Sequence, residues 1–183
     1  MNPNRVLVLF AHPAPHLSRV NRRLAEAARL IEGVYLHDLY ETYPDFYIDP
    51  AREHALLAQA DTLVFLFPLQ WYSMPALLKE WADVVLRDAW SGTPAASGRR
   101  FWLATSTGAG AADFAPGGHQ GYADFLAPFQ QMSAACGMEW IAPLVLHGAH
   151  DVAAAAVDAH IADFSARLLH LAGHPFALGS DGT

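Results

Sequence analysis

Hydrophobic positions gather in five short runs, and a stretch with helical spacing follows each run. The runs cover residues 5–10, 34–39, 62–67, 100–106 and 139–146. The spacing predicts a helix capped by Ser18 and ended by Gly33, then helices over 51–59, 75–87, 122–136 and 153–171. Runs that do not alternate with polar residues are typical of strands covered on both faces. The order of elements therefore predicts an α/β fold with a doubly wound parallel sheet.

The strand order follows from the first turn and from one proline. No G-x-G-x-x-G motif follows Phe10, which argues against a half-Rossmann arrangement. A flavodoxin-like order 2-1-3-4-5, with helices on both faces, instead places the loops after strands 1, 3 and 4 side by side. Pro143 predicts that the fifth strand lies at an edge, because proline cannot donate to a ladder. We expect a single domain over residues 1–172 and a loosely ordered tail over 173–183.

Composition narrows the classes of function. The chain has 183 residues and a formal net charge of −7, which argues against a nucleic-acid-binding surface. Its one cysteine, Cys136, excludes an intrachain disulfide framework and is expected to be a small core residue. Neither a signal peptide nor an apolar segment of about 18 residues is seen. These features predict a cytoplasmic protein.

The first of the three loops, residues 11–21, joins a buried strand to the start of a helix. Free amide hydrogens and the positive end of the helix dipole favour a phosphate there. Donors are supplied by His12, Ser18 and Asn21, and Arg19 adds a positive charge. The alternative is a capped helix whose approach two prolines stiffen.

The second loop, residues 66–75, places two aromatic rings between two prolines directly after the third strand. Its backbone amides are suited to the polar edge of a flavin or a base. Packing in a core or a dimer interface is the alternative for Trp71 and Tyr72.

The third loop follows the fourth strand at residues 106–110. Gly108 and Gly110 permit a close approach of the backbone to a ligand. Further along, His119 is a candidate proton donor. Although His147 and His150 have i, i+3 spacing, no carboxylate or cysteine frame accompanies them. We therefore predict that the chain holds no metal.

These motifs together resemble a known family. His12-Pro13 with Ser18 and Asn21, the segment 68–75 and Ser106-Thr107-Gly108 resemble the flavodoxin-like NAD(P)H:quinone oxidoreductases over nearly the whole chain. The likeness is strongest to a small bacterial branch that includes the ancillary flavoprotein of glutathione-regulated potassium-efflux systems. Segment 39–49 is also similar to that branch.

The resemblance implies a homodimer that binds FMN, with FAD as the alternative, and uses NAD(P)H as co-substrate. Hydride would pass from the nicotinamide to the flavin and then to a quinone or similar electrophile, with ping-pong kinetics. Three groups of residues would hold the flavin: His12, Ser18, Arg19, Val20 and Asn21 at the phosphate; Leu69, Gln70, Trp71 and Tyr72 at the ring; and Ser106, Thr107, Gly108 and Ala109 at its far edge and ribityl chain. Phe114, with Trp71 and Tyr72, would shape the substrate cleft, and Tyr43, Phe46 or His119 would close it from the partner subunit.

The chain departs from this family at two positions. Ala109 stands where many members have a third glycine, and Phe114 stands near a tyrosine of larger relatives. His119 is then the candidate proton donor of that loop. Two other functions stay open: a redox-regulatory subunit of a potassium-efflux transporter, peripheral at the inner face of the cell membrane, and a flavodoxin-like electron carrier.

Overall fold

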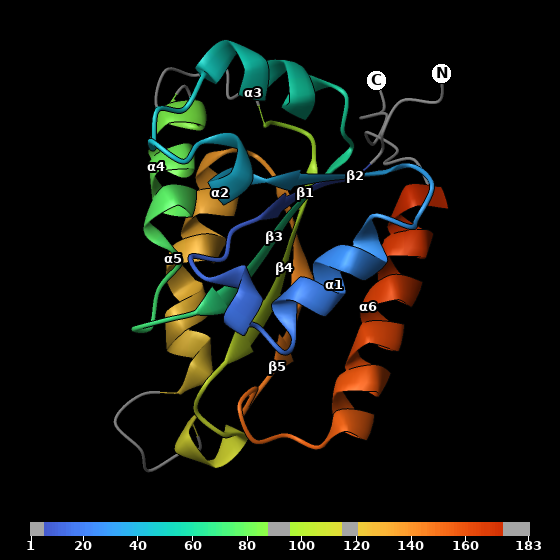
Figure 1. Cartoon of the computed structure of the whole chain (residues 1–183). Coiled ribbons are helices and arrows are strands. Elements are labelled where there is room, and N and C mark those ends of the chain that lie inside the picture. Colours follow the sequence, from blue (N-terminus) through green and yellow to red (C-terminus); the bar gives the residue numbers. More distant parts are fainter. Residues whose placement is uncertain (1–5, 88–95, 115–120, 174–183) are drawn as a thin grey trace, which may run out of the picture.

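The fold is a five-stranded parallel sheet. The computed structural model describes residues 6–87, 96–114 and 121–173. All four strand pairings are parallel, and the order is β2-β1-β3-β4-β5, which confirms the predicted flavodoxin-like topology (Figure 1). As predicted from Pro143, β5 lies at an edge, and the β4–β5 register shifts between Trp102 and Ala104. The strands are β1 (Val6–Phe10), β2 (Val34–Asp38), β3 (Thr62–Leu69), β4 (Arg100–Thr107) and β5 (Glu139–Leu146).

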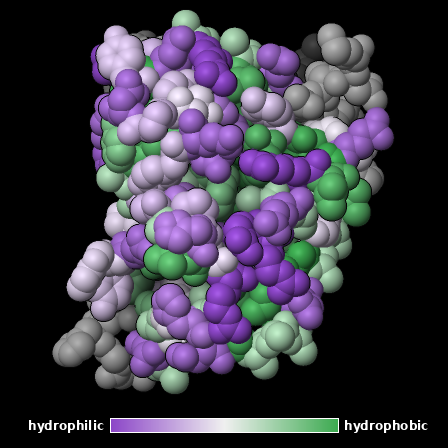
Figure 2. Space-filling view, in the orientation of Figure 1, coloured by the Kyte–Doolittle hydropathy of each residue, from purple (hydrophilic) through white to green (hydrophobic). Residues whose placement is uncertain are grey.

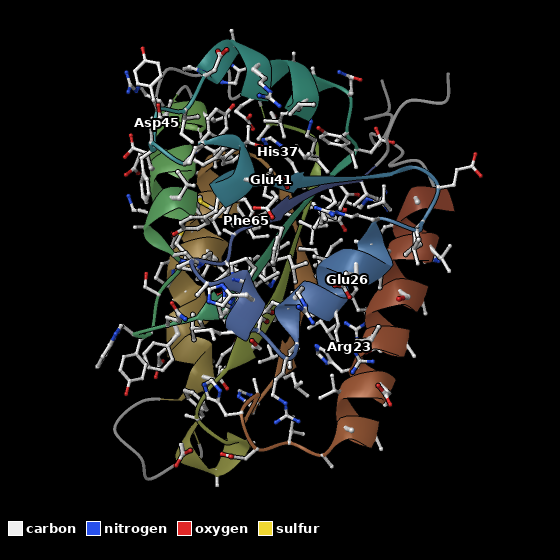
Figure 3. All side chains as sticks on the ribbon, viewed as in Figure 1. Arg23, Glu26, His37, Glu41, Asp45 and Phe65 are labelled. Carbon is white, nitrogen blue, oxygen red and sulfur yellow. The ribbon has the colours of Figure 1, made fainter. Side chains whose placement is uncertain are left out.

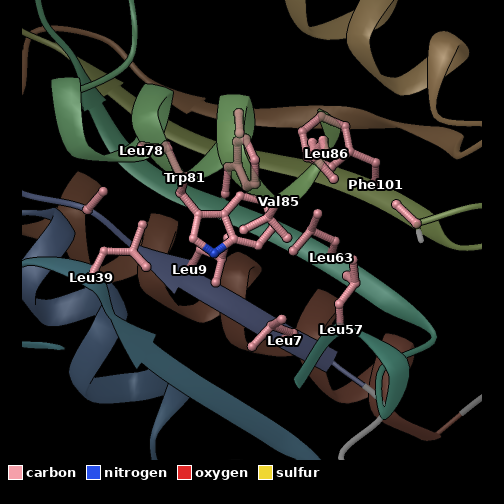
Figure 4. Close-up of a cluster of buried hydrophobic side chains, with 14 of the residues drawn as sticks. Leu7, Leu9, Leu39, Leu57, Leu63, Leu78, Trp81, Val85, Leu86 and Phe101 are labelled. Carbon is pink, nitrogen blue, oxygen red and sulfur yellow. The ribbon is translucent and has the colours of Figure 1, made fainter. Parts of the chain in front are cut away.

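Helices cover both faces of the sheet, so side chains that alternate along each strand enter two separate cores. Leu7 and Leu9 belong to the core on the side of α3, α4 and α5, whereas Val8 and Phe10 belong to the core beneath α1 and α6. The first core is centred on the fully buried Trp81 (Figure 4). The helices are η1 (Pro15–Leu17), α1 (Asn21–Ala28), α2 (Leu39–Thr42), α3 (Pro50–Ala58), α4 (Ala76–Val85), η3 (Ala111–Phe114), α5 (Tyr122–Ala135) and α6 (Ala154–Gly173).

The third strand continues two residues beyond the predicted end, through Pro68 to Leu69. In a parallel strand, alternate residues bond to opposite neighbours. Leu66 faces β1, because its carbonyl accepts from Ala11 N–H, and Pro68 falls on the same side. Since β1 ends at Phe10, the missing N–H of Pro68 costs no ladder bond. The proline therefore lets β3 reach past β1 toward the second loop.

The first helix begins later than predicted, because the chain first makes a short 3₁₀ turn at Pro15. Ser18 follows that turn with an extended backbone, and α1 starts at Asn21 with Val20 at its N-cap. The Ser18 hydroxyl still accepts a hydrogen bond from Arg22 N–H at 3.3 Å. Ser18 thus satisfies one first-turn amide although it is not the N-cap residue.

A buried carboxylate, which the sequence pattern did not reveal, fixes the edge of the first core. Glu53 is fully buried and accepts hydrogen bonds from His37 Nε2 at 2.9 Å, Tyr43 Oη at 2.5 Å and Trp81 Nε1 at 2.7 Å. Figure 3 shows His37 among the side chains between the sheet and the helices above it. This network holds α2 and α3 against the sheet.

The face drawn in Figure 2 carries many hydrophilic side chains. In the view of Figure 2 the hydrophobic residues form several separate groups between charged and polar ones. Arg23 of α1 points toward α6, where it pairs with Asp158 at 2.7 Å (Figure 3). Cys136 is buried, as predicted. No helix of the described part of the chain is long and apolar enough to span a membrane.

We predict that Glu53→Gln lowers the free energy of unfolding at pH 7 by about 2 kcal/mol, because the bonds to the remaining oxygen become neutral and the new NH2 group cannot accept a hydrogen bond. Burial raises the pKa of Glu53, but the bonds from His37, Tyr43 and Trp81 outweigh it and leave the pKa lowered. The stabilisation is therefore complete above the ordinary carboxyl pKa and is lost as pH falls through the lowered one.

Urea unfolding of wild type and variant across this pH range measures the difference. Glu41→Gln is the matched control, because the Glu41 side chain is 75% exposed and should change stability by less than about 0.5 kcal/mol. Equal effects of the two substitutions would contradict the role assigned to the network.

Candidate functional site

The three predicted loops meet at the carboxyl edge of the sheet and enclose two adjoining pockets. We call the first the phosphate pocket. It is lined by residues of the first loop (11–21) together with Pro68, Leu69, Gln70, Ser106, Gly108, Ala149 and His150. The second, the ring cleft, is lined by Leu69, Gln70, Trp71, Tyr72, Thr107, Gly108, Ala109, Phe114 and His150. Four residues line both pockets and form a neck between them: Leu69, Gln70, Gly108 and His150.

The structure brings together most of the residues predicted for the site. The phosphate pocket contains His12, Ser18, Arg19, Val20 and Asn21, and the ring cleft contains Phe114, all as expected in position. What these residues bind stays a prediction. His119 lies outside the described residues, so its predicted role as proton donor stays a prediction as well.

Tyr43 and Phe46 line neither pocket of their own chain, and their predicted role at the cleft of a partner subunit stays a prediction. Tyr43 is 6% exposed and its hydroxyl donates to Glu53, so it is buried in the core of its own chain. Burial first, and then the Glu53 carboxylate, raise the pKa of Tyr43. Phe46 packs against Tyr40 and lines neither pocket of this chain. Segment 39–49 contains α2 and supplies Tyr43 to the Glu53 network.

Positive charge and hydrogen-bond donors gather in the phosphate pocket. Of the described residues that line the two pockets, none is a carboxylate, although the whole chain has a net charge of −7. Burial, and then the neighbouring His16, lower the pKa of His12. Its Nδ1 accepts from Ala14 N–H at 3.1 Å, so the neutral ring carries its proton on Nε2 as a donor.

One buried polar atom in the phosphate pocket lacks a protein partner. Asn21 is 2% exposed, and its Nδ2 donates to Ser106 Oγ at 2.8 Å. The Oδ1 atom of the same amide is buried without a hydrogen bond. Such an atom carries a desolvation cost of about 1–3 kcal/mol unless a ligand supplies a donor.

The second loop is a tight turn in a strained conformation. Gln70 and Ser73 exchange two backbone hydrogen bonds of 3.1 Å, and between them Trp71 and Tyr72 have φ angles of 49° and 64°. Two left-handed central residues are the arrangement that asparagine and glycine normally occupy in a two-residue hairpin turn. Trp71 is 94% exposed, while Tyr72 stacks on Phe125 at 4.9 Å. The core-packing alternative for Trp71 is thus wrong, and strain of this kind is characteristic of functional sites.

A fourth loop, between β5 and α6, completes the site. Gly148 N–H donates to the Ala109 carbonyl at 2.8 Å, and Ala149 N–H donates to the Thr107 carbonyl at 2.9 Å. The sequence prediction considered His147 and His150 only as metal ligands. Ligand sites in parallel sheets lie at the carboxyl ends of the strands. The fourth loop follows the carboxyl end of β5, so the same criterion that selects the first three loops also selects the fourth.

A chain of side-chain hydrogen bonds ties the fourth loop to the third. The Thr107 hydroxyl donates to the Ala109 carbonyl at 2.7 Å and lies 2.9 Å from His147 Nδ1. Because its single hydrogen is used, the hydroxyl must accept from His147, which places the imidazole proton on Nδ1. Burial lowers the pKa of His147, consistent with a neutral ring. Within the described residues no group of three or more His, Cys, Asp or Glu is placed to hold a metal ion.

We predict that Trp71→Asn raises the free energy of unfolding by about 1 kcal/mol, because asparagine tolerates the left-handed conformation better than tryptophan. The 94% exposed ring has little packing to lose. Tyr47→Asn is the control: Tyr47 is 80% exposed and is not among the residues with positive φ. Chemical denaturation at protein concentrations where every variant is monomeric compares the two variants, and a loss of stability in Trp71→Asn there would show that the turn is not strained.

Comparison with known proteins agrees with this architecture. A general stress protein 14 from Treponema denticola, solved in complex with FMN, is 34% identical with a TM-score of 0.82, over 91% of this chain and 99% of that one. An NADPH-quinone reductase from P. pentosaceus is 25% identical with a TM-score of 0.80, over 90% and 97%. A protein described as a thermophilic tryptophan halogenase from Streptomycin violaceusniger is 37% identical with a TM-score of 0.84, over 89% and 98%.

The family model described as "flavodoxin-like fold" matches residues 4–168, which is most of the chain. The match includes all four loops that surround the two pockets. This chain belongs to the family of proteins with a flavodoxin-like fold.

Proposed function

We propose that the protein is an FMN-dependent NAD(P)H oxidoreductase that reduces a quinone or a similar electrophile. One observation carries the proposal: a pocket rich in donors, with no acidic lining residue among those described, opens through a neck into a cleft with aromatic walls. FMN has the same sequence of parts, namely a phosphate, a polyol chain and a flat ring system. Relatives named as an FMN complex and as an NADPH-quinone reductase support it.

The phosphate would lie against the start of α1. The Arg19 guanidinium supplies positive charge, and its donors reach the carbonyls of His150 and, at 3.5 Å, of Val152, which fix its position. Neutral His12 offers Nε2–H, and Ser18 adds a hydroxyl. Val20 lines the same pocket next to the helix start, where the dipole favours an anion.

The polyol chain would satisfy the unpaired atom of Asn21. A phosphate dianion has no hydrogen to donate, whereas a ribityl hydroxyl does, so Oδ1 fits the polyol better than the phosphate. Ser106, 3% exposed and bonded to the same amide, lies beside it. FMN is preferred to FAD in this proposal because its single phosphate matches the single cationic side chain of the phosphate pocket.

The ring would lie in the cleft between the second and third loops. Gly108 gives close access to the backbone, while Trp71, Tyr72 and Phe114 supply apolar walls. Phe114 is held at an angle of 39° to His147, with ring centroids 5.1 Å apart. When bound, the flavin supplies the two-electron chemistry, and the protein binds and orients it.

We predict that the purified protein binds FMN and oxidises NADPH or NADH when a quinone is present.

The double variant Asn21→Leu/Ser106→Ala should keep its stability within about 1 kcal/mol, because both partners of a buried hydrogen bond become apolar. It should weaken FMN binding at least about 10-fold, because the donor and acceptor are lost. Visible absorbance, flavin fluorescence quenching and nicotinamide oxidation measure these effects.

Wild-type protein that binds neither FMN nor FAD would overturn the proposal. A parallel aerobic reaction with tryptophan, a bromide salt, FMN and NADPH, in which dioxygen is the oxidant, tests the chemistry named for the 37% identical relative. A brominated product without quinone reduction would replace the proposed activity.

We propose further that the protein is a homodimer whose second copy covers the rim of the ring cleft. Trp71 and Tyr72 are 94% and 63% exposed in the single chain, and burying two aromatic rings in an interface is favourable. Sedimentation of wild type should give twice the monomer mass, and Trp71→Asn should shift the protein toward monomer at low concentration. A monomeric wild type at all concentrations would contradict this assembly.

A further inference from the structure

The neck between the two pockets contains a histidine from the fourth loop. Gln70 and His150 are the two neck residues with polar side-chain atoms, and Gln70 belongs to the predicted ring loop. His150 lies 42 positions beyond Gly108 in the sequence, yet a side-chain carbon built on Gly108 would meet the imidazole Cδ2 at 3.2 Å and Nε2 at 3.3 Å. The imidazole therefore packs on the glycine that the sequence marks for close ligand approach.

The main chain that carries this imidazole is fixed by both neighbouring loops. Arg19 of the first loop donates to the His150 carbonyl, and the amides of Gly148 and Ala149 bond the carbonyls of the third loop. Arg19 also reaches the Val152 carbonyl at 3.5 Å. A backbone held in this way presents its side chain to a ligand without a large loss of conformational entropy in the loop.

We propose that His150 is a specificity-determining residue that hydrogen-bonds the polyol segment of the ligand. The inference rests on the proposed function, since it requires a ligand with a phosphate end and a ring end. A ligand that occupies both pockets must pass through the neck with its middle section. In FMN that section is the ribityl chain, whose hydroxyls donate and accept, and imidazole nitrogens can do both.

Three flavins separate the parts of the ligand in a binding experiment. Lumiflavin contains only the ring system, riboflavin adds the ribityl chain, and FMN adds the phosphate. We expect His150→Phe to weaken riboflavin and FMN alike, by about 3- to 10-fold, because one hydrogen bond is lost while a flat ring still packs on Gly108. Lumiflavin affinity should stay within about 2-fold of wild type, since its contacts do not involve the lost nitrogen atoms.

His150→Gln is the matched variant, because glutamine keeps one donor and one acceptor group. It should recover most of the riboflavin affinity lost in His150→Phe. Fluorescence quenching gives the three dissociation constants for each protein, and thermal unfolding confirms that each variant is folded.

Each other outcome overturns the inference. If His150→Phe lowers the affinities for lumiflavin and riboflavin equally, His150 lies at the ring. If only the affinity for FMN falls, His150 lies at the phosphate, and if no affinity falls, His150 is not part of the site. Failure of the wild-type protein to bind any flavin is a different result, because it would overturn the proposed function itself.

Discussion

Two backbone hydrogen bonds continue the pairing of β4 and β5 beyond the ends of the strands, and the shape of the site depends on them. They run from Gly148 to Ala109 and from Ala149 to Thr107. Because each carbonyl belongs to the third loop and each amide to the fourth, neither loop can move independently. The Thr107 hydroxyl and Arg19 extend the same connection to His147 and to the first loop. The first, third and fourth loops are consequently connected to one another without a ligand.

The hydrogen-bonded third and fourth loops contrast with the second loop, whose turn is strained. The turn at Trp71 and Tyr72 keeps two aromatic residues in a backbone conformation that glycine and asparagine adopt at lower cost. Together with the unpaired Oδ1 of Asn21, it forms a group of features that lower stability and belong to residues lining the two adjoining pockets. Stability lost at a site and recovered in the core is a common arrangement, and the hydrogen bonds on the buried Glu53 are one such contribution in the core.

The topology and the convergence of three loops were predictable because they depend on local patterns. Continuous apolar runs identified every strand, Pro143 identified the edge, and the parallel order then determined which loops meet. Contacts between residues far apart in sequence were not predictable. The Glu53 carboxylate gave no signal on its short helix, and its three donors come from separate elements. The sequence resemblance therefore assigns Tyr43 to the substrate cleft and gives no sign of its buried hydrogen bond to Glu53. His150 was missed because its spacing from His147 suggested a metal site.

The central claim is that four loops form one elongated site for a flavin mononucleotide. The most direct test is an NMR titration of the isotopically labelled protein with FMN. The account predicts that amide resonances of Asn21, Gln70, Gly108 and Ala149 shift together with a single affinity, while those of His37 and Leu57 near the Glu53 network stay unchanged. Shifts confined to one loop, or centred on the groove lined by Met74, Ala82 and Met132 between α4 and α5, would contradict it.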